Sequence, residues 1–294
     1  MATIHKRIKN FFVTKITSRK PLGKGFRLSS AGVVEKFYLP YLTEGCFRVE
    51  TFASLHEFAR FLDGLTPKDA LTYGFFGDAE SGVVVSEAKK AENPERYIAA
   101  KTRTRKDMSW NGKSGILFLD YDPPENSPVL TKQELINIVR QACPFLENVE
   151  MIWRPSSSSF IKNSDSGNMV HDLRGQHIYI VVEQTFQIEM IGKMIVERLW
   201  LAGFGRYDVS KSGSLLERTI VDASVWQPER LDYVGGSVTE KPLKQIKFKA
   251  HIFPGRTKVL STKMIPELSN QELAEVKKLK NMSNNNEFRK YATK

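Results

Sequence analysis

The amino-acid sequence predicts an α+β fold, and three observations lead to this prediction. Short apolar stretches typical of strands and segments with helical periodicity both occur along the whole chain, without the strict alternation of a parallel α/β fold. The chain has 294 residues, of which 41% are hydrophobic, so it can bury a sizeable core as one large domain or two modest ones. No internal repeat is present, so a solenoid or propeller is not expected.

Features that the sequence lacks narrow the class of protein further. No apolar run approaches the roughly 18 residues that a membrane-spanning helix needs, which excludes an integral membrane protein. The two cysteines, Cys46 and Cys143, lie far apart in the sequence. They argue against a disulfide scaffold and against a structural zinc site built on thiolates, and they favour a reducing compartment.

Turn and capping residues divide the chain into its predicted elements. Gly64 ends an amphipathic helix, and Thr131 followed by Glu134 is the capping box of a second one. Pro123 and Pro124 stop an apolar strand that ends in carboxylates. Helices are expected over residues 51–65, 131–146, 186–203 and 269–282. Strands are expected over residues 70–76, 82–85, 115–122, 149–155, 176–182, 218–222 and 230–236.

The positive charge is concentrated at the two ends of the chain. In total, 44 Lys and Arg stand against 33 Asp and Glu, a net charge of +11. Residues 1–34 hold eight basic residues and no acid, and residues 241–266 hold seven and no acid, whereas residues 35–240 carry a net charge of −6. Basic segments of this kind commonly track a phosphate backbone, because each Lys or Arg displaces counterions from it.

This charge distribution predicts three segments. A basic N-terminal arm over residues 1–34 packs on or leads into a core over residues 35–240. A basic C-terminal extension over residues 241–294 contains the last helix and a frayed tail. The first 20 residues also have the composition of an organelle presequence, but a solvated basic arm is the favoured interpretation.

Two carboxylates at the end of a buried strand suggest a metal site. Asp120 and Asp122 are two residues apart, so in a strand they project from the same face, about 6.5–7 Å apart. Such a pair is costly to bury unless a cation lies between them. Mg²⁺ and Mn²⁺ favour carboxylate oxygens and are often held by one or two of them together with substrate phosphates. The alternative is that the pair caps the strand end and faces water.

A third carboxylate would strengthen a metal site. Asp222 ends the predicted strand TIVD, and Asp232 is a rival for the same role. Neighbouring strand ends can assemble a site from separate segments, although a turn-forming Asp is the simpler interpretation of Asp222.

Two further sets of residues are candidates for contacts with phosphates. His177 begins a strand after a loop that contains four consecutive serines, whose hydroxyls and backbone amides can bind phosphate oxygens. A satisfied structural histidine is the alternative. The cluster with Lys101, Arg103 and Arg105 can contact a triphosphate or a template backbone, or it can be a solvated surface loop.

Three stretches in order resemble one protein family. They are FLDYDPP, then the Ser-rich loop that leads to RGQHIYIVV, then LERTIVDASVWQPERL, and together they span roughly residues 111–236. This combination resembles the archaeo-eukaryotic primase superfamily, most closely the primase-polymerases of phages, plasmids and integrated mobile elements. The resemblance implies an RRM-like catalytic core with mixed or antiparallel sheets flanked by helices. It also implies the use of Mg²⁺ or Mn²⁺ to join nucleotides on a DNA template.

The resemblance assigns roles to individual residues. Asp120 and Asp122 become the metal ligands of the first motif, and Asp222 becomes the catalytic carboxylate of the third. His177 becomes the nucleotide-phosphate contact of the second motif. This motif departs from the family pattern, because Gly-Gln stands before the histidine where the family has Ser-x-His. The remaining nucleotide-binding candidates are Ser157 or Ser158, which would supply the missing serine, and Arg218 and Arg230.

The expected function is therefore that of a DNA primase or DNA-directed polymerase in the replication of a mobile element. It would use two Mg²⁺ or Mn²⁺ ions, nucleoside triphosphates and a single-stranded or primed DNA template. No G-x-x-x-x-G-K-[ST] motif occurs, so strand unwinding needs a separate or fused helicase. No membrane partner is expected, and the expected location is the cytoplasm of a bacterial or phage-infected cell.

Two other classes of function remain open at this point. A metal-dependent nuclease or a D-x-D sugar-nucleotide transferase would also place carboxylates after an apolar strand. A non-catalytic replication initiator would explain the basic ends of the chain but not the buried carboxylates.

Overall fold

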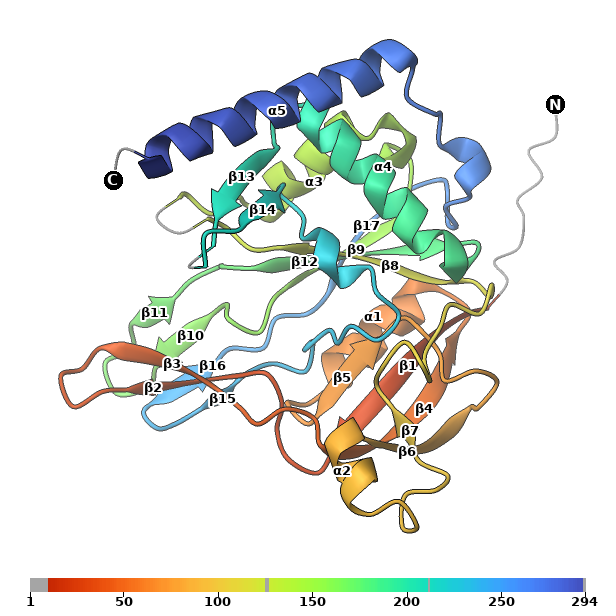
Figure 1. The fold of residues 1–294 in the computed structure, drawn as a ribbon. Coiled ribbons are helices and arrows are strands. Elements are labelled where there is room, and N and C mark those ends of the chain that lie inside the picture. The colour runs from red at the N-terminus through yellow and green to blue at the C-terminus, as the bar shows by residue number, and fades with distance from the viewer. Residues whose placement is uncertain (1–9, 125–126, 211, 293–294) are drawn as a thin grey trace.

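The computed structural model describes residues 10–124, 127–210 and 212–292, and it has the mixed α+β architecture that the sequence predicts. Figure 1 shows two larger sheets in the body of the molecule, helices over one of them and smaller sheets to one side. None of the helices in this part of the chain combines the length and the apolar character that crossing a membrane requires.

The first of the larger sheets has five strands in the order β5-β1-β4-β6-β7. Its strands are β1 (Phe11–Ser18), β4 (Glu44–Phe52), β5 (Asp69–Thr72), β6 (Ser81–Val85) and β7 (Lys101–Thr102). Strand β1 is antiparallel to both of its neighbours, β4 and β5. Phe11, Val13 and Ile16 of this strand have no exposed surface.

The position of β1 differs from the solvated arm expected at the N-terminus. Residues 11–18 lie inside a sheet, because their apolar side chains fill its core. The basic side chain of Lys15 extends to the rim, where it forms an ion pair with Asp69. Residues 1–9 of the expected arm lie outside the described residues.

The second larger sheet is antiparallel and has the order β17-β9-β12-β8. Its strands are β8 (Gly115–Tyr121), β9 (Met151–Pro155), β12 (Gln176–Val182) and β17 (His251–Phe253). Strand β8 forms one edge and is buried along its length except at Asp120, as its apolar sequence predicts. Strand β12 is buried at every residue. The polar residues within these strands are therefore enclosed by a large apolar core.

Helices cover both faces of this second sheet. Helices α3 (Lys132–Ala142) and α4 (Ile188–Leu201) lie over one face, and α1 (Leu55–Gly64) lies on the other, between the two larger sheets (Figure 1). Helix α3 begins at the predicted capping box of Thr131 and Glu134, which is confirmed. The side chain of Phe58 in α1 contacts the ring of Tyr179 in β12, with the ring centroids 5.7 Å apart.

The last helix is longer than expected. Helix α5 (Asn270–Ala292) continues through most of the segment that was expected to fray, and it packs against α4 and the strand β13 (Arg206–Val209). A short helix that the sequence did not indicate, α2 (Glu87–Glu92), follows β6.

Two predicted strands are wrong. Residues 218–222 were expected to form a strand, but β14 (Leu215–Arg218) ends where that strand should begin. It pairs with β13 as a hairpin, and Asp222 instead caps the 3-10 helix Ala223–Val225. Residues 230–236 form no strand and contribute a single bridge, between Asp232 and Leu71 of β5. Both stretches have apolar residues that contact the core, but their backbones have too few hydrogen-bonding partners to form a continuous strand.

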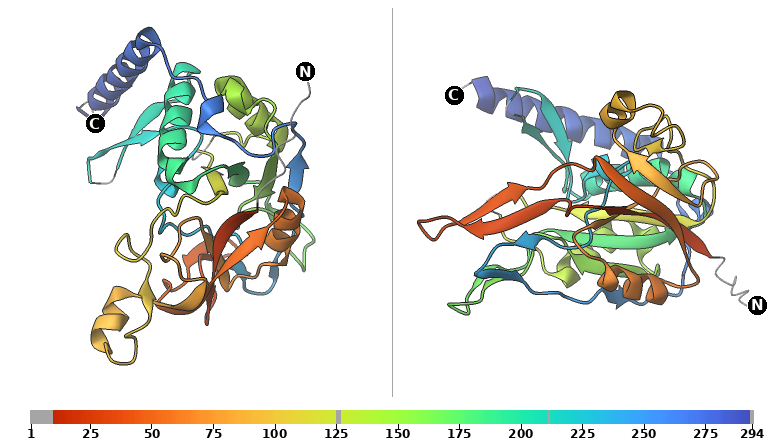
Figure 2. Two further views of the ribbon diagram at one scale, coloured as in Figure 1. Left: turned by 90° about the vertical axis from the view of Figure 1, so that its right-hand side faces the viewer. Right: turned by 90° about the horizontal axis from the view of Figure 1, so that it is seen from below.

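Two three-stranded sheets bring together distant parts of the sequence. Their orders are β15-β2-β3 and β11-β10-β16. The strands are β2 (Lys24–Leu28), β3 (Val34–Tyr38), β10 (Ile161–Asn163), β11 (Met169–His171), β15 (Val238–Thr239) and β16 (Leu243–Gln245). These strands form a lobe beside the larger sheets (Figures 1 and 2). The two basic ends of the sequence therefore meet in one place, since β16 of the C-terminal extension contacts β2, which also pairs directly with β15.

Candidate active site

A row of polar residues crosses three adjacent strands of the second sheet. His177 of β12 is directly opposite Asp120 of β8 on one side and Arg154 of β9 on the other. Directly opposed residues project from the same face of a sheet, so all three side chains share one face. The Nε2 atom of His177 lies 3.4 Å from Oδ1 of Asp120. The sequence predicted roles for His177 and Asp120 separately, and the strand register brings them into contact.

A buried aspartate lies behind His177. The Nδ1 atom of His177 is 3.4 Å from Oδ1 of Asp232, whose side chain is only 1% exposed. The hydroxyls of Tyr73 and Tyr179 donate hydrogen bonds of 2.7 and 2.9 Å to the other oxygen, Oδ2. Oδ1 itself has no hydrogen-bond partner among the described residues. The imidazole is thus held between two carboxylates, one at the sheet edge and one in the interior.

His177 and Asp232 affect each other's pKa. Burial lowers the pKa of His177, but the negative charges of Asp232 and Asp120 outweigh burial and raise it above the ordinary value. Burial raises the pKa of Asp232, and the neighbouring His177 and the two tyrosine hydroxyls oppose this only in part. The arrangement favours a positively charged imidazole that faces the edge of the sheet.

Asp122 and Asp222 complete a group of acidic residues at the end of β8. The backbone N–H of Asp222 donates a 2.8 Å hydrogen bond to the carbonyl of Asp120, which places Asp222 beside the free edge of the strand. Burial and then the charge of Asp120 raise the pKa of Asp122, and the charge of Asp222 adds to this effect. Lys24 of β2 acts in the opposite direction on the pKa of Asp122. The three aspartates that the sequence singled out therefore gather at one strand end.

The aspartates do not form a complete metal site as they stand. In the described part of the chain, no three or more His, Cys, Asp or Glu side chains are grouped so that they could hold a metal ion. Asp222 is engaged elsewhere, because its two oxygens accept hydrogen bonds of 2.9 and 2.8 Å from the backbone and hydroxyl of Ser224. The donor chemistry still fits Mg²⁺ or Mn²⁺, which favour carboxylate oxygens. Burial is the main cause of the raised pKa of Asp122, and the charges of Asp120 and Asp222 add a repulsion that a divalent cation would relieve.

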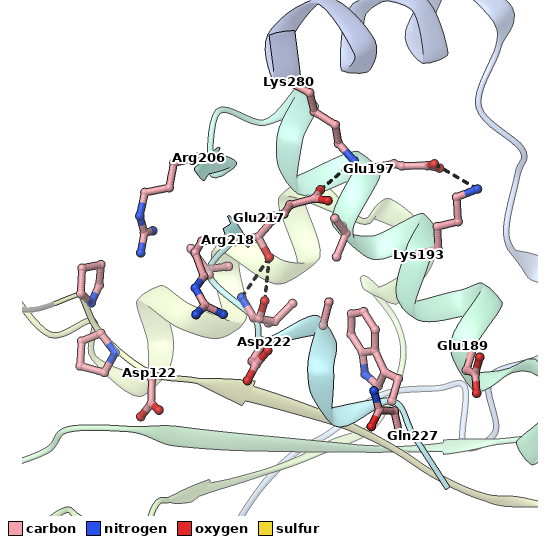
Figure 3. A pocket seen from close by; sticks show the side chains of 18 of the residues that line it. Asp122, Glu189, Lys193, Glu197, Arg206, Glu217, Arg218, Asp222, Gln227 and Lys280 are labelled. Atoms are coloured by element: carbon pink, nitrogen blue, oxygen red, sulfur yellow. Dashed lines mark hydrogen bonds and ion pairs between the residues drawn. The ribbon is translucent and has the colours of Figure 1, made fainter. Parts of the chain in front are cut away.

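A cavity of about 650 Å³ opens beside Asp122 and Asp222. Arg218 of β14 and Arg206 of β13 line it, and Figure 3 shows their guanidinium groups on the same side of the cavity as the two aspartates. Further charged side chains from α4, α5, β14 and the loop before β8 complete the wall, namely Lys193, Lys280, Arg105, Glu189, Glu197 and Glu217. A cavity with arginines on one wall and carboxylates at its floor suits a phosphorylated ligand.

The Ser-rich loop meets this site through Gly175. A Cβ atom at Gly175 would lie 2.7 Å from Oδ1 of Asp122 and 2.7 Å from Oγ of Ser156, so the two groups flank the glycine closely. Ser158 bonds to Ser156 through its hydroxyl at 2.9 Å, while Ser157 presents its carbonyl to Gln245. The serine that faces Asp122 is thus Ser156, which stands one place before the two serines that the sequence singled out.

Two of the four remaining basic candidates are held by Glu229. Arg103 donates a 2.8 Å hydrogen bond to the carbonyl of Glu229, and Arg105 forms an ion pair with the Glu229 side chain at 3.3 Å. Lys101 lies in β7 of the first sheet. Arg230 is exposed and, within the described residues, is not among those that line the cavity. Of these four residues only Arg105 reaches the cavity.

Sequence reasoning missed several residues of the site. Tyr179 stands two residues after His177, so period-two spacing in a strand could have placed both on one face. Arg154 and Lys24 gave no such signal, because their positions depend on strand pairing and on a lobe built from distant segments. Comparisons with models of protein families, with curated proteins and with solved structures find no match.

Proposed function

We propose that the protein is a template-dependent nucleotidyltransferase, a DNA primase or DNA-directed polymerase that acts in the replication of a mobile element. One observation carries the proposal. Three aspartates from two distant segments, Asp120 and Asp122 of one and Asp222 of the other, gather at one strand end beside a cavity that Arg206 and Arg218 line together with further basic and acidic side chains. The negatively charged phosphates of a nucleoside triphosphate can bind to the arginine side chains in such a cavity.

The chain connectivity around the site supports an RRM-like core. Helix α3 connects β8 to β9, and β12 lies between these two parallel strands, which makes a split β-α-β unit. The family that the three sequence motifs resemble has this kind of core. The proposed site lies at the end of the first strand of the unit.

Asp120 and Asp122 are the residues that would hold Mg²⁺ or Mn²⁺, and Asp222 would join them if its side chain turned away from Ser224. When bound there, the ions would neutralise the charge that develops on the phosphate oxygens during transfer. The protein's own part is to bind and orient the reactants, which accounts for much of the acceleration in reactions of this type.

His177 and Arg218 would contact the phosphates of the incoming nucleotide. The Tyr179 hydroxyl, 3.1 Å from Nδ1 of His177, and the carboxylate of Asp232 hold the imidazole, and Asp232 favours its charged form, so that its other nitrogen faces the site. Arg218 is only loosely paired, since its Nε lies 3.9 Å from Asp208, and its guanidinium is free to give a bidentate contact to phosphate. The DNA template is the proposed partner of the basic lobe.

The decisive experiment is primer extension by purified protein. A labelled primer on a DNA template is incubated with deoxyribonucleotides or ribonucleotides and Mn²⁺ or Mg²⁺. The wild type is expected to extend the primer, and Asp120→Asn and Asp122→Asn are expected to lower the rate by at least about 100-fold, because each removes a charge essential to the site. The exposed Asp78→Asn serves as the matched control.

The same assay separates the alternatives. Shortening of the primer would indicate a metal-dependent nuclease, and DNA binding with neither synthesis nor degradation would indicate a replication initiator. Undiminished synthesis by either site variant would overturn the proposal.

A further inference from the structure

Two stacked phenylalanine rings lie at the surface of the lobe. The rings of Phe160 and Phe248 are 3.8 Å apart between centroids and inclined by 28°. Phe248 is 40% exposed, and Phe160 is partly exposed. Within the described residues, neither ring belongs to a hydrophobic cluster of the core. The pair is therefore not explained by core packing.

The backbone at Phe160 is held in an unusual conformation. Its φ of +57° is the only positive value at a non-glycine residue in the described part of the chain. This conformation is unfavourable for a bulky side chain and persists only where the surroundings enforce it. Here Ile246 donates a 2.8 Å backbone hydrogen bond to the Phe160 carbonyl, and Phe160 donates one of 3.1 Å to Asp172. The structure thus fixes the ring of Phe160 beneath Phe248.

Three lysines lie close to Phe248 in the sequence. Lys244, Lys247 and Lys249 are all exposed, and the described chain has no acidic residue from 241 to 266. Cations next to an exposed aromatic face are the combination by which proteins bind single strands of nucleic acid, with bases stacked on the rings and phosphates on the lysines.

The rings also lie close to the candidate active site. Phe160, Phe248 and Lys247 line a small pocket together with Arg154 and Ser156. Ser156 flanks Gly175 opposite Asp122, and Arg154 is in the polar row with His177. A strand that stacks on the rings would therefore run toward the carboxylates.

We propose that Phe160 and Phe248, with Lys244, Lys247 and Lys249, form a stacking site for unpaired bases of single-stranded nucleic acid. We call these five residues the stacking platform. The occupant follows from charge complementarity and from the exposed aromatic faces. That the bound strand is the template rests on the proposed function, whereas the binding itself does not.

The test measures binding without synthesis. Fluorescence anisotropy compares the wild type with Phe248→Ala. The ligands are labelled oligothymidylate and oligouridylate of about 20 nucleotides, in EDTA and without nucleoside triphosphates. We expect the variant to bind about tenfold or more weakly, the loss that one stacked base produces. Phe248→Trp is expected to restore binding, because indole also stacks. Phe186→Ala is the matched control, because it removes another exposed phenylalanine, which lies in the 3-10 helix Thr185–Gln187.

An abasic oligonucleotide of the same length separates stacking from a damaged fold. It keeps the phosphates but has no bases, so wild type and Phe248→Ala should bind it equally. Lys247→Ala with Lys249→Ala should weaken both ligands and reduce the dependence of binding on salt. Equal binding of oligothymidylate by wild type and Phe248→Ala would overturn the proposal. An equal loss on both ligands would overturn it too, as would a preference of the platform for anionic lipid vesicles.

The outcome is independent of the fate of the proposed function. If Asp120→Asn still synthesises while Phe248→Ala loses binding, the polymerase assignment fails and the stacking platform stands. If synthesis requires Asp120 but Phe248→Ala binds normally, the platform fails and the polymerase assignment stands.

Discussion

The two larger sheets each contact a buried aspartate, and the pKa values of these two aspartates shift in opposite directions. Asp69 lies in β5 of the first sheet and is 7% exposed, and Asp232 lies against the second sheet and is 3% exposed. The pKa of Asp69 is lowered, because its hydrogen bonds outweigh the effect of burial, while burial raises the pKa of Asp232. The two side chains have similarly low exposure, but Asp232 lies deeper in the protein, and the pKa values of the two carboxyl groups shift in opposite directions.

The partners of the two carboxylates explain the difference. Thr17 and Lys15 bind one oxygen of Asp69 at 2.8 and 3.2 Å, and the hydroxyl and N–H of Thr66 bind the other at 2.8 and 3.0 Å. Asp232 receives two hydroxyls on one oxygen and leaves the other against His177. A fully satisfied carboxylate stabilises the scaffold, whereas a partly satisfied one next to a histidine serves to position that histidine.

The strongest way to test this contrast is Asp232→Asn. We expect primer extension to fall by about 10- to 100-fold, the usual cost of removing a group that orients a site residue. Folding stability should change little, because the native carboxylate is itself poorly satisfied. Thermal unfolding and the ¹⁵N chemical shifts of His177 check the two parts of this prediction. A large loss of stability with an unchanged imidazole signal would contradict the positioning role.

A second prediction concerns the tight contact at Gly175. An added methyl group must displace Asp122 or Ser156, because it would lie 2.7 Å from an oxygen of each. We expect Gly175→Ala to lower primer extension about tenfold, since small misplacements at a reacting centre are costly. Gly64→Ala is the control, because no atom lies within 4 Å of the added carbon. Wild-type activity in Gly175→Ala would show that this contact is not part of the site.

The smallest effect is expected at Asp69. Asp69→Asn should lower the free energy of unfolding by about 1–3 kcal/mol at neutral pH, because it breaks hydrogen bonds to a charged group. Primer extension should be unaffected. Urea denaturation measures the first effect, with Asp78→Asn as the control.

The pH dependence of this loss follows from the pKa shift. Because the pKa of Asp69 is lower in the folded state, its contribution is present above the unfolded value of about 3.9. The contribution is lost as the pH falls through the lower, folded pKa. The difference between wild type and Asp69→Asn should therefore shrink as the pH falls below about 3.9. A difference that stays constant as the pH falls below that value would mean that the charge of Asp69 does not stabilise the fold.

Local patterns predicted the parts of the fold that depend on local sequence. The capping box of α3 and the helix that ends at Gly64 are both present, as is the buried strand that ends in Asp120. The central place of β1 could not be predicted, because it depends on pairing with β4 and β5. The same holds for the strand expected at residues 218–222, where apolar residues reach the core without forming a ladder.

The candidate site also has residues that the local sequence predicted and contacts that only the fold reveals. The motif residues Asp120, Asp122 and His177 were found by type and spacing, and the structure places them together. Asp232 was considered only as a metal ligand, whereas its contacts place it behind His177. The pairing of the Phe160 and Phe248 rings gave no signal at all, because nothing in the sequence indicates which residues of two distant loops will meet.

The parallel pairing of β15 with β2 has a consequence for the order in which the protein is made. It joins residues 25–26 to residues 238–239, whereas the strands of the first sheet that surround β1 lie within the first 72 residues. Contacts between distant segments generally form late, because a long loop must close first. As the chain leaves the ribosome from its N-terminus, the sheet of β2 and β3 lacks its third strand until β15 has been made, and Phe248 emerges later still. The newly made protein therefore acquires its carboxylates before the surface that we propose binds nucleic acid.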